Sequence, residues 1–254
     1  TNRPFLITPM AGQWQVDVDG DGVNDLMVDL GVLDPADPPT SGGLANAIND
    51  SGQVCGLAKD ALGNSRAFSW TEAAGMLDLG TLGRPSPHVA HGVENSGSVV
   101  GHSYVDSQSF HAIYWTEAGG MIDLGTLPGG NRSTATDING SGRIVGGAFL
   151  PGNAASEPVT WAGVGELLVE VGTFGGTAGS AYAVNDSDQV VGMASDSSGK
   201  WHAFLLTPPS PGVFFQDLDS NGINDLLLDL GALSPSNVQS LANDLDEAGR
   251  VVGY

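Results

Sequence analysis

Short apolar runs separated by polar turns recur along the whole chain. One unit, residues 110–146, contains the run FHAIYW, the turn TEAGG, the run MIDLG, a glycine-rich loop and the hairpin TATDINGSGRIVG. Aromatic and β-branched residues bounded by Gly, Asn and Pro are typical of strands, and Asn139 followed by Gly142 is typical of a tight turn. The unit therefore predicts four short strands and no helix.

The same order of runs and turns returns about every 45 residues. Five apolar residues share one position of the unit: Phe5, Phe68, Ile113, Val159 and Phe204. Five glycines share another: Gly56, Gly101, Gly146, Gly192 and Gly253. A period near 45 residues with four strands per unit is typical of β-propeller blades. We therefore predict one all-β domain over residues 1–254, a five-bladed β-propeller of four-stranded antiparallel blades, with repeats at about 3–65, 66–109, 110–155, 156–198 and 199–254.

The sizes of the residues predict the order of strands within a blade. Segments rich in Ala, Gly and Ser, such as residues 180–184, fit the crowded centre; the VVG run, the aromatic run and the MxDLG run then follow outward. With this strand order, the chain begins with an outer pair of strands and ends with an inner pair. We therefore expect Tyr254 to lie beside Thr1, so that the two pairs complete one blade and close the ring without exposed sheet edges.

Two long insertions between a third and a fourth strand carry one acidic pattern. The first has Asp17, Asp19, Asp21 and Asp25, and the second has Asp217, Asp219, Asn221 and Asp225. Oxygens at alternate positions converge when the backbone curls, the glycine at position 6 permits the turn, and the carbonyls of Val23 and Ile223 add one ligand each. This donor set suits a hard cation, so the sequence predicts two structural calcium sites at the rim. An EF-hand would need an acid at position 12, where Val28 and Leu228 stand.

Charge and composition narrow the partners. Eight basic against 29 acidic residues give a net charge of −21, which argues against nucleic acid or anionic membrane as a partner and favours cations. The chain has no apolar run of membrane-spanning length and no leader-like start, so we expect any secretion signal to have been removed already. Low Lys, high Gly and the calcium loops favour an extracellular or cell-surface location, although a halophile's cytoplasm would also explain the acidity. The single cysteine, Cys55, replaces a valine of the other repeats, and we expect it to be buried.

The runs FHAIYW, WHAFLL and RAFSW, together with GMIDLGTLPGG and INGSGRIVG, resemble the HAF-type repeats of bacterial secreted proteins over essentially the whole chain. The acidic loops look like the calcium hairpins in the FG-GAP blades of integrin α-subunit propellers. The resemblance implies a propeller-like fold and an extracellular location, and it implies no catalytic residues. The histidine of the repeat is present at His111 and His202, whereas Arg3, Arg66 and Glu157 replace it elsewhere.

These observations favour a non-catalytic binding or scaffold module for a carbohydrate or an extracellular protein. Ligand sites on propellers usually form from the loops that enter the inner strands and join the second and third strands. Those loops carry Arg84, His88, Tyr104, Asn131, Arg132, Lys200 and Trp201. His88 and His91 should point to opposite faces of one strand, which argues against a zinc site.

Two other functions stay open. A five-bladed glycoside hydrolase would present inner-strand carboxylates into a funnel, and the candidates are Glu94, Asp137, Asp244 and Asp246. Alternatively, terminal strand pairs that exchange between molecules or propellers that stack would make the chain a subunit of an extracellular fibre, with copies of itself as partners.

Overall fold

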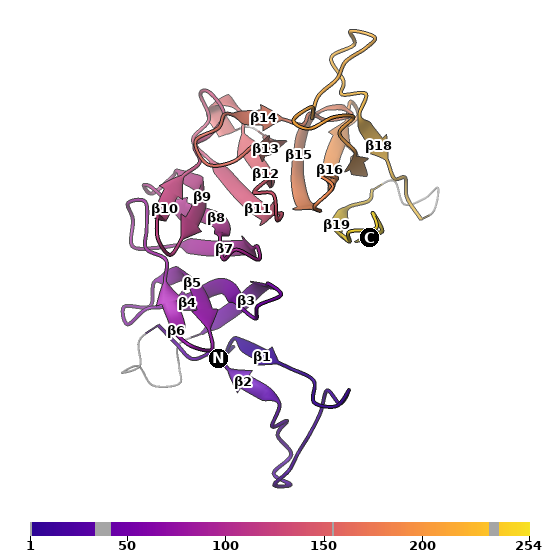
Figure 1. Ribbon diagram of the computed structural model, residues 1–254. Coiled ribbons are helices and arrows are strands. Elements are labelled where there is room, and N and C mark those ends of the chain that lie inside the picture. The colour runs from indigo at the N-terminus through magenta and orange to yellow at the C-terminus, as the bar shows by residue number, and fades with distance from the viewer. Residues whose placement is uncertain (1, 34–41, 154, 234–238) are drawn as a thin grey trace.

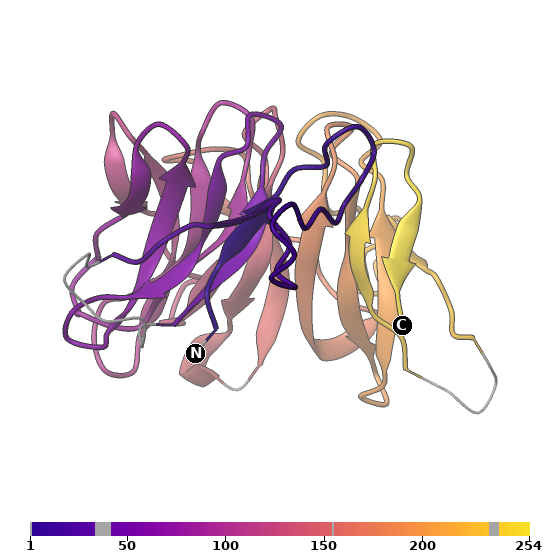
Figure 2. The same cartoon turned by 90° about the horizontal axis from the view of Figure 1, so that it is seen from below.

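The structure is a computed structural model that describes residues 2–33, 42–153, 155–233 and 239–254. Within these ranges the fold is built from strands, and the only helical segment is a short 3₁₀ turn at Pro151–Asn153. Figure 1 shows the sheets following one another along an open arc. In Figure 2, seen from below, the strands run between the two faces of that arc. The prediction of an all-β fold is confirmed.

Four antiparallel sheets have four strands each, in chain order. Sheet 1 contains β3 (Gly43–Ile48), β4 (Val54–Lys59), β5 (Ser65–Thr71) and β6 (Gly75–Asp78). Sheet 2 contains β7 (His88–Val93), β8 (Val99–Tyr104), β9 (Phe110–Thr116) and β10 (Gly120–Asp123). Sheet 3 contains β11 (Ser133–Ile138), β12 (Ile144–Phe149), β13 (Ser156–Trp161) and β14 (Leu168–Glu170). Sheet 4 contains β15 (Gly175–Val184), β16 (Val190–Asp196), β17 (Trp201–Leu206) and β18 (Leu227–Asp229).

Two-stranded sheets stand at both ends of the arc. The N-terminal pair is β1 (Phe5–Ile7) with β2 (Met27–Asp29), and the C-terminal pair is β19 (Ala242–Leu245) with β20 (Val251–Gly253). By their place in the repeat, β1 and β2 are a third and a fourth strand, and β19 and β20 are a first and a second. Figure 1 shows the first strands along the inside of the arc and the fourth strands on its outside, which confirms the expected strand order.

A bulge in every first strand explains why a glycine recurs at one position of every second strand. The strand register shifts between Ala135 and Asp137 in β11, and the equivalent shift occurs in the four other first strands. Gly146 faces this bulge, and a Cβ there would overlap the carbonyl oxygen of Thr134. Equivalent overlaps with a first-strand carbonyl exist at Gly56, Gly101 and Gly192, and Gly253 has the same overlap with the carbonyl of Leu241, just before β19. Each position therefore requires a residue without a side chain.

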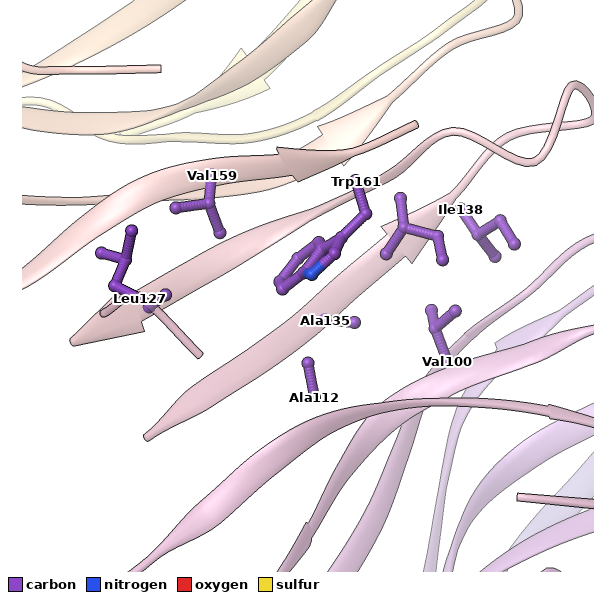
Figure 3. Packing of buried hydrophobic residues seen from close by; sticks show 9 residues of the cluster. Val100, Ala112, Leu127, Ala135, Ile138, Val159 and Trp161 are labelled. Atoms are coloured by element: carbon purple, nitrogen blue, oxygen red, sulfur yellow. The ribbon is translucent and has the colours of Figure 1, made fainter. Parts of the chain in front are cut away.

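Apolar side chains pack in the seams between successive sheets. Figure 3 shows Trp161 of sheet 3 among Ala135 and Ile138 of its own sheet and Val100 and Ala112 of sheet 2. The indole Nε1 of Trp161 donates a hydrogen bond to the carbonyl of Leu124 at 3.0 Å, so the buried ring leaves no donor unpaired. An equivalent seam between sheets 1 and 2 contains Cys55, whose burial is confirmed and raises the pKa of its thiol to about 12.

The asparagine turns hold neighbouring sheets together. The side-chain amide of Asn49 donates to the carbonyl of Glu94 at 3.0 Å, and that of Asn139 donates to the carbonyl of Asn185 at 2.9 Å. Asn185 in turn donates to the carbonyl of Asp246 at 3.1 Å. The same side chains cap their own turns, since Asn139 Oδ1 accepts the backbone N–H of Ser141 and of Arg143. One residue type thus shapes the turn and fixes the distance to the next sheet.

The ring does not close within the chain, and here the structure departs from our expectation. β1 pairs with β2 and β20 pairs with β19, but the described strands show no pairing between β1 and β20. Figure 1 places these pairs at opposite ends of the arc. The seams between the sheets set the angle from one sheet to the next, and this angle leaves the arc open after four sheets and two pairs. Thr1 itself lies outside the described residues.

The contact between glycine and bulge yields a prediction about stability. Replacing Gly146 with alanine places a methyl group against the Thr134 carbonyl, so the hairpin must shift. We expect G146A to lower the free energy of unfolding by about 2 to 3 kcal/mol in urea denaturation.

Gly42 is the matched control, because a Cβ there would meet only the carbonyl oxygen of Asn2 at 3.5 Å, an ordinary contact. G42A should therefore change the free energy of unfolding by less than about 1 kcal/mol. Equal losses in the two variants would show that the bulge does not constrain Gly146.

Candidate metal centres

The two acidic insertions leave the outer side of the arc. One connects β1 to β2 and the other connects β17 to β18, so both join a third strand to a fourth as expected. In Figure 1 both project away from the sheets, one at each end of the drawn molecule. Neither insertion lies along the inner strands.

Three carboxylates converge in each loop. Single oxygens of Asp17, Asp19 and Asp21 all lie within 4.8 Å of one another, and so do those of Asp217, Asp219 and Asp225. Two oxygens bound to one calcium ion at about 2.4 Å can be no more than about 4.8 Å apart. The carboxylates are therefore close enough to share one cation in each loop, and a hard cation is the kind that they prefer.

Matching backbone hydrogen bonds give the loops one shape. The N–H of Gly22 donates to Asp17 at 3.0 Å, and the N–H of Gly222 donates to Asp217 at 2.8 Å. Both glycines have left-handed φ angles, 83° and 81°. The glycine at position 6 therefore makes the sharp turn that the loop pattern predicts. These donors favour the charged carboxylate, and the pKa of Asp217 is accordingly lowered, first by the Gly222 amide.

The ninth position closes each loop. Asp25 Oδ2 accepts the backbone N–H of Val18 at 2.6 Å, and Asp225 Oδ2 accepts that of Leu218 at 2.6 Å. Asn221 stands where the first loop has Asp21, and its side-chain oxygen accepts the N–H of Ile223 at 2.7 Å. The corresponding contact in the first loop joins Asp21 to the N–H of Val23, also at 2.7 Å. The side chains at positions 5 and 9 thus make the same backbone contacts in both loops.

Sequence reasoning missed the residues that anchor the loops, Asn24 and Asn224. Asn224 is 1% exposed, and its amide donates to the carbonyls of Phe214 and Val171, both at 2.7 Å. Its oxygen accepts the N–H of Gln216 at 3.0 Å. Asn24 makes the equivalent bonds to Trp14 and Val16. The available signal was the dipeptide Asn-Asp at the same place in both insertions.

The predicted ligand-binding residues do not gather into one site. His88 is fully buried, with Nδ1 2.8 Å from Ser103 Oγ and Nε2 2.7 Å from the carbonyl of Arg84, so it supports the fold. Lys200 and Trp201 lie at the turn between β16 and β17, in sheet 4.

Part of the set does come together, around Phe110. The ring of Tyr104 lies 5.2 Å from that of Phe110, and the guanidinium of Arg132 lies 5.7 Å from the same ring. The neighbouring Asn131 instead donates to Ser109 Oγ at 3.0 Å.

A histidine pair that was not predicted from the sequence lies beside this aromatic group: the ring of His102 is 5.3 Å from that of Phe110. His91 Nε2 is 3.1 Å from His102 Nδ1, and burial lowers the pKa of the two rings to about 4 and about 3. His88 bonds to Ser103 and His91 to His102, so the two point to opposite faces as expected. Within the described residues, no third histidine, cysteine or carboxylate joins the pair to form a metal cluster.

The carboxylates considered for catalysis bond to backbone amides. Glu94 accepts the N–H of Ser98 at 3.0 Å and Asp246 accepts the N–H of Arg250 at 2.9 Å, so both cap their own turns. Asp244 accepts the N–H of Leu245 at 2.8 Å.

Asp137 reaches into the neighbouring sheet. It accepts the N–H of Ile138 at 2.8 Å and the N–H of Val184 in sheet 4 at 2.9 Å. Burial outweighs these bonds and raises its pKa to about 6.

A side-chain contact between the third and fourth strands recurs through the repeats and gives the repeated histidine a structural role. His111 Nδ1 lies 2.7 Å from Asp123, and His202 Nδ1 lies 2.9 Å from Asp229. Arginine takes the histidine position in two other units, where Arg3 pairs with Asp29 and Arg66 with Asp78. Sheet 3 breaks the pattern with Glu157 and Glu170. Burial, then the charge of Glu170, raises the pKa of Glu157 to about 7.

Comparisons with known proteins do not place the chain in a family. No protein-family model matches the sequence, and no curated protein is significantly similar to it. In the part of the chain that the structure describes, no helix has the length and apolar character needed to cross a membrane.

The buried Asn224 should carry much of the stability of its loop. Replacing it with alanine leaves the carbonyls of Phe214 and Val171 without their donor, and we expect N224A to lose about 2 to 3 kcal/mol of unfolding free energy. N24A is the matched control at the more exposed equivalent, and we expect it to lose about 1 kcal/mol. A loss in N24A as large as that in N224A would contradict the role of burial.

The acidic pair of sheet 3 should make stability depend on pH. A carboxyl whose pKa is raised in the folded state opposes folding when it is ionised. The cost is absent below the ordinary pKa of 4.5, grows as the pH rises and is complete above about 7.

We therefore expect E157Q to raise the free energy of unfolding by roughly 1 to 2 kcal/mol at pH 8, because the half-buried carboxyl is partly screened by water. At pH 4 the variant and the parent should be equally stable in urea denaturation. E117Q, at an exposed turn, is the control and should show no difference at either pH. A gain in E157Q that is the same at pH 4 and pH 8 would show that charge is not its cause.

Proposed function

We propose that this chain is a non-catalytic, calcium-stabilised β-propeller of the HAF-repeat type that acts as a binding or scaffold module for a carbohydrate or an extracellular protein. The four-stranded sheets, the small residues of the first strands and the apolar seams support a propeller. In this proposal the protein has five blades, and the fifth is divided between the two terminal pairs.

The observation that carries the proposal is the pair of matching acidic loops. Each brings single oxygens of three carboxylates within 4.8 Å of one another, at positions 1, 3 and 5 in the first loop and at positions 1, 3 and 9 in the second. In both loops the N–H of the glycine at position 6 donates to the carboxylate at position 1. Such groups repel one another unless a cation neutralises them. In each loop calcium would be held by the carboxylates at positions 1, 3 and 9, by the side chain at position 5 and by the carbonyl of Val23 or Ile223. It would stabilise the loop and take no part in a reaction.

Two features support a binding role over a glycosidase, and a third supports the proposed location. The inner-strand carboxylates cap turns or bond to a neighbouring sheet, which gives each a structural task. The acidic loops lie on the outer side of the arc, away from the inner strands. A net charge of −21 and the preference of such loops for millimolar calcium fit an extracellular or cell-surface place without nucleic acid or membrane insertion.

Calcium titration tests the proposal. Isothermal titration calorimetry should detect two calcium ions per chain, and free calcium at a hundred times the dissociation constant should add about 2.7 kcal/mol of stability per site. D19N and D219N should each weaken one site at least tenfold and leave the other intact. E117Q, which removes an exposed charge outside the loops, should still bind two ions.

The absence of binding heat, together with a melting temperature that calcium leaves unchanged, would refute the metal sites. A screen against arrayed glycans and immobilised extracellular proteins then addresses the ligand. Turnover of chromogenic glycosides that is lost in D137N would refute the non-catalytic part of the proposal.

A further inference from the structure

The two ends of the arc are complementary parts of one sheet. In every complete sheet the second strand pairs with the third in a fixed register, with Val54 opposite Trp70 and Gly56 opposite Phe68 in sheet 1. β20 is a second strand without a third strand, and β1 is a third strand without a second, among the described strands. The repeat register would place Val252 opposite Leu6 and Gly253 opposite Phe5.

Side chains that are covered in the complete seams are exposed at the two ends. Val252 is 62% exposed, whereas its equivalents are fully buried: Cys55, Val100, Val145 and Val191. Ile48 is 55% exposed, whereas its equivalents Ile138 and Val184 are buried. In complete seams these two positions belong to one cluster, as Val100 and Ile138 do between sheets 2 and 3. Ile48 at the N-terminal end therefore provides the contact that Val252 lacks at the C-terminal end.

A hollow at the C-terminal end has the shape of an incomplete seam. The seam between sheets 1 and 2 groups Ala67, Leu79, Ala90 and Val99 around Trp115. At the C-terminal end the equivalents of the first four line a hollow: Ala203, Leu230, Ala242 and Val251. The residue equivalent to Trp115 is Ile7 of β1.

A second hollow lies at the N-terminal end, and there the other half of the seam is missing. It is lined by Ala45, Ile48 and Val54 of sheet 1 together with Phe5 and Ile7 of β1. In complete seams the equivalents of Ala45, Ile48 and Val54 pack around a valine of the preceding second strand, as Ala135, Ile138 and Ile144 do around Val100. That valine is Val252 at the C-terminal end. Each hollow thus matches the strand pair at the other end.

Polar groups at the ends match as well. Asp137 accepts the N–H of Val184 across a seam at 2.9 Å, and the equivalent residues at the ends are Asp244 and Ile48. Asn46 donates to the carbonyl of Ala90 at 2.7 Å, and the equivalent donor at the C-terminal end is Asn243. A seam between the two ends would therefore satisfy backbone groups as the complete seams do.

We propose that the C-terminal pair of one copy joins the N-terminal pair of a second copy, with β20 antiparallel to β1, to form one four-stranded sheet. A second copy is the partner because the seams hold the two ends of one chain apart (Figure 1). Each copy offers one end of each kind, so the assembly is head-to-tail and can add further copies. This inference goes beyond the proposed function and does not rest on the calcium sites.

Crosslinking between two singly substituted proteins tests the register. With Cys55 replaced by valine, the residue of the other repeats, L6C and V252C are prepared separately, mixed and oxidised. We expect a disulfide-linked dimer that contains one chain of each. L62C, at an 86% exposed turn residue, is the control and should not crosslink to V252C.

The L6C/V252C double variant separates the alternatives. Crosslinked oligomers support joining between copies, whereas a crosslinked monomer, with no dimer from the mixed single variants, would show that the ring closes within one chain and would overturn the proposal. The absence of any crosslink would overturn the pairing itself.

Sedimentation of the parent chain gives an independent readout. Average mass should rise with protein concentration, and more so in 0.5 M NaCl, because salt screens the repulsion between chains of charge −21. V252D should weaken association at least tenfold, and L62D should behave as the parent does. A parent chain that stays monomeric at all concentrations would refute the proposal.

Discussion

The burial of both faces of each sheet is the constraint on which this fold depends. A four-stranded sheet of this size exposes apolar side chains on two faces, and each fully buried Val, Ile or Phe contributes roughly 1.5 to 3 kcal/mol. Sheets 1 to 4 cover one another, as Trp161 of sheet 3 does with Val100 of sheet 2. The repeats follow from this need, because a sheet alone would leave both faces in water. The glycine of each hairpin and the asparagine of three hairpins serve the same purpose, since the glycine allows the bulge and the asparagine fixes the distance to the next sheet.

The strand order within a sheet could be predicted because it depends on local features. Turn residues, alternating apolar positions and small residues identify four strands per unit and their order from the inside outward. The angle between sheets could not be predicted in this way. It depends on the combined volumes of residues from two sheets, such as Trp161 with Ala112 and Val100, and no single position in the sequence records it. The expected closure of the ring is therefore where the structure departs from the pattern.

In the acidic loops, too, the features that depend on nearby residues could be predicted, and those that depend on distant residues could not. Alternate carboxylates and a glycine at position 6 act within nine residues, so their spacing was enough to bring Asp217, Asp219 and Asp225 together. Asn224 escaped notice because its decisive contact, with the carbonyl of Val171, crosses to another sheet. The histidine pair escaped for a related reason: only the register of β7 against β8 brings His91 beside His102.

The proposed calcium binding and the proposed joining of copies both involve the N-terminal pair. The loop that carries Asp17, Asp19 and Asp21 connects β1 to β2, and β1 is the strand that a second copy would extend. A cation that holds this loop in one shape fixes the ends of β1 and β2, so the strand edge loses less conformational freedom when a partner binds. A bound cation also reduces the negative charge of each chain, which weakens the electrostatic repulsion between two copies. Because linkage is reciprocal, joining of copies would in turn strengthen calcium binding at the first loop and leave the second loop, between β17 and β18, less affected.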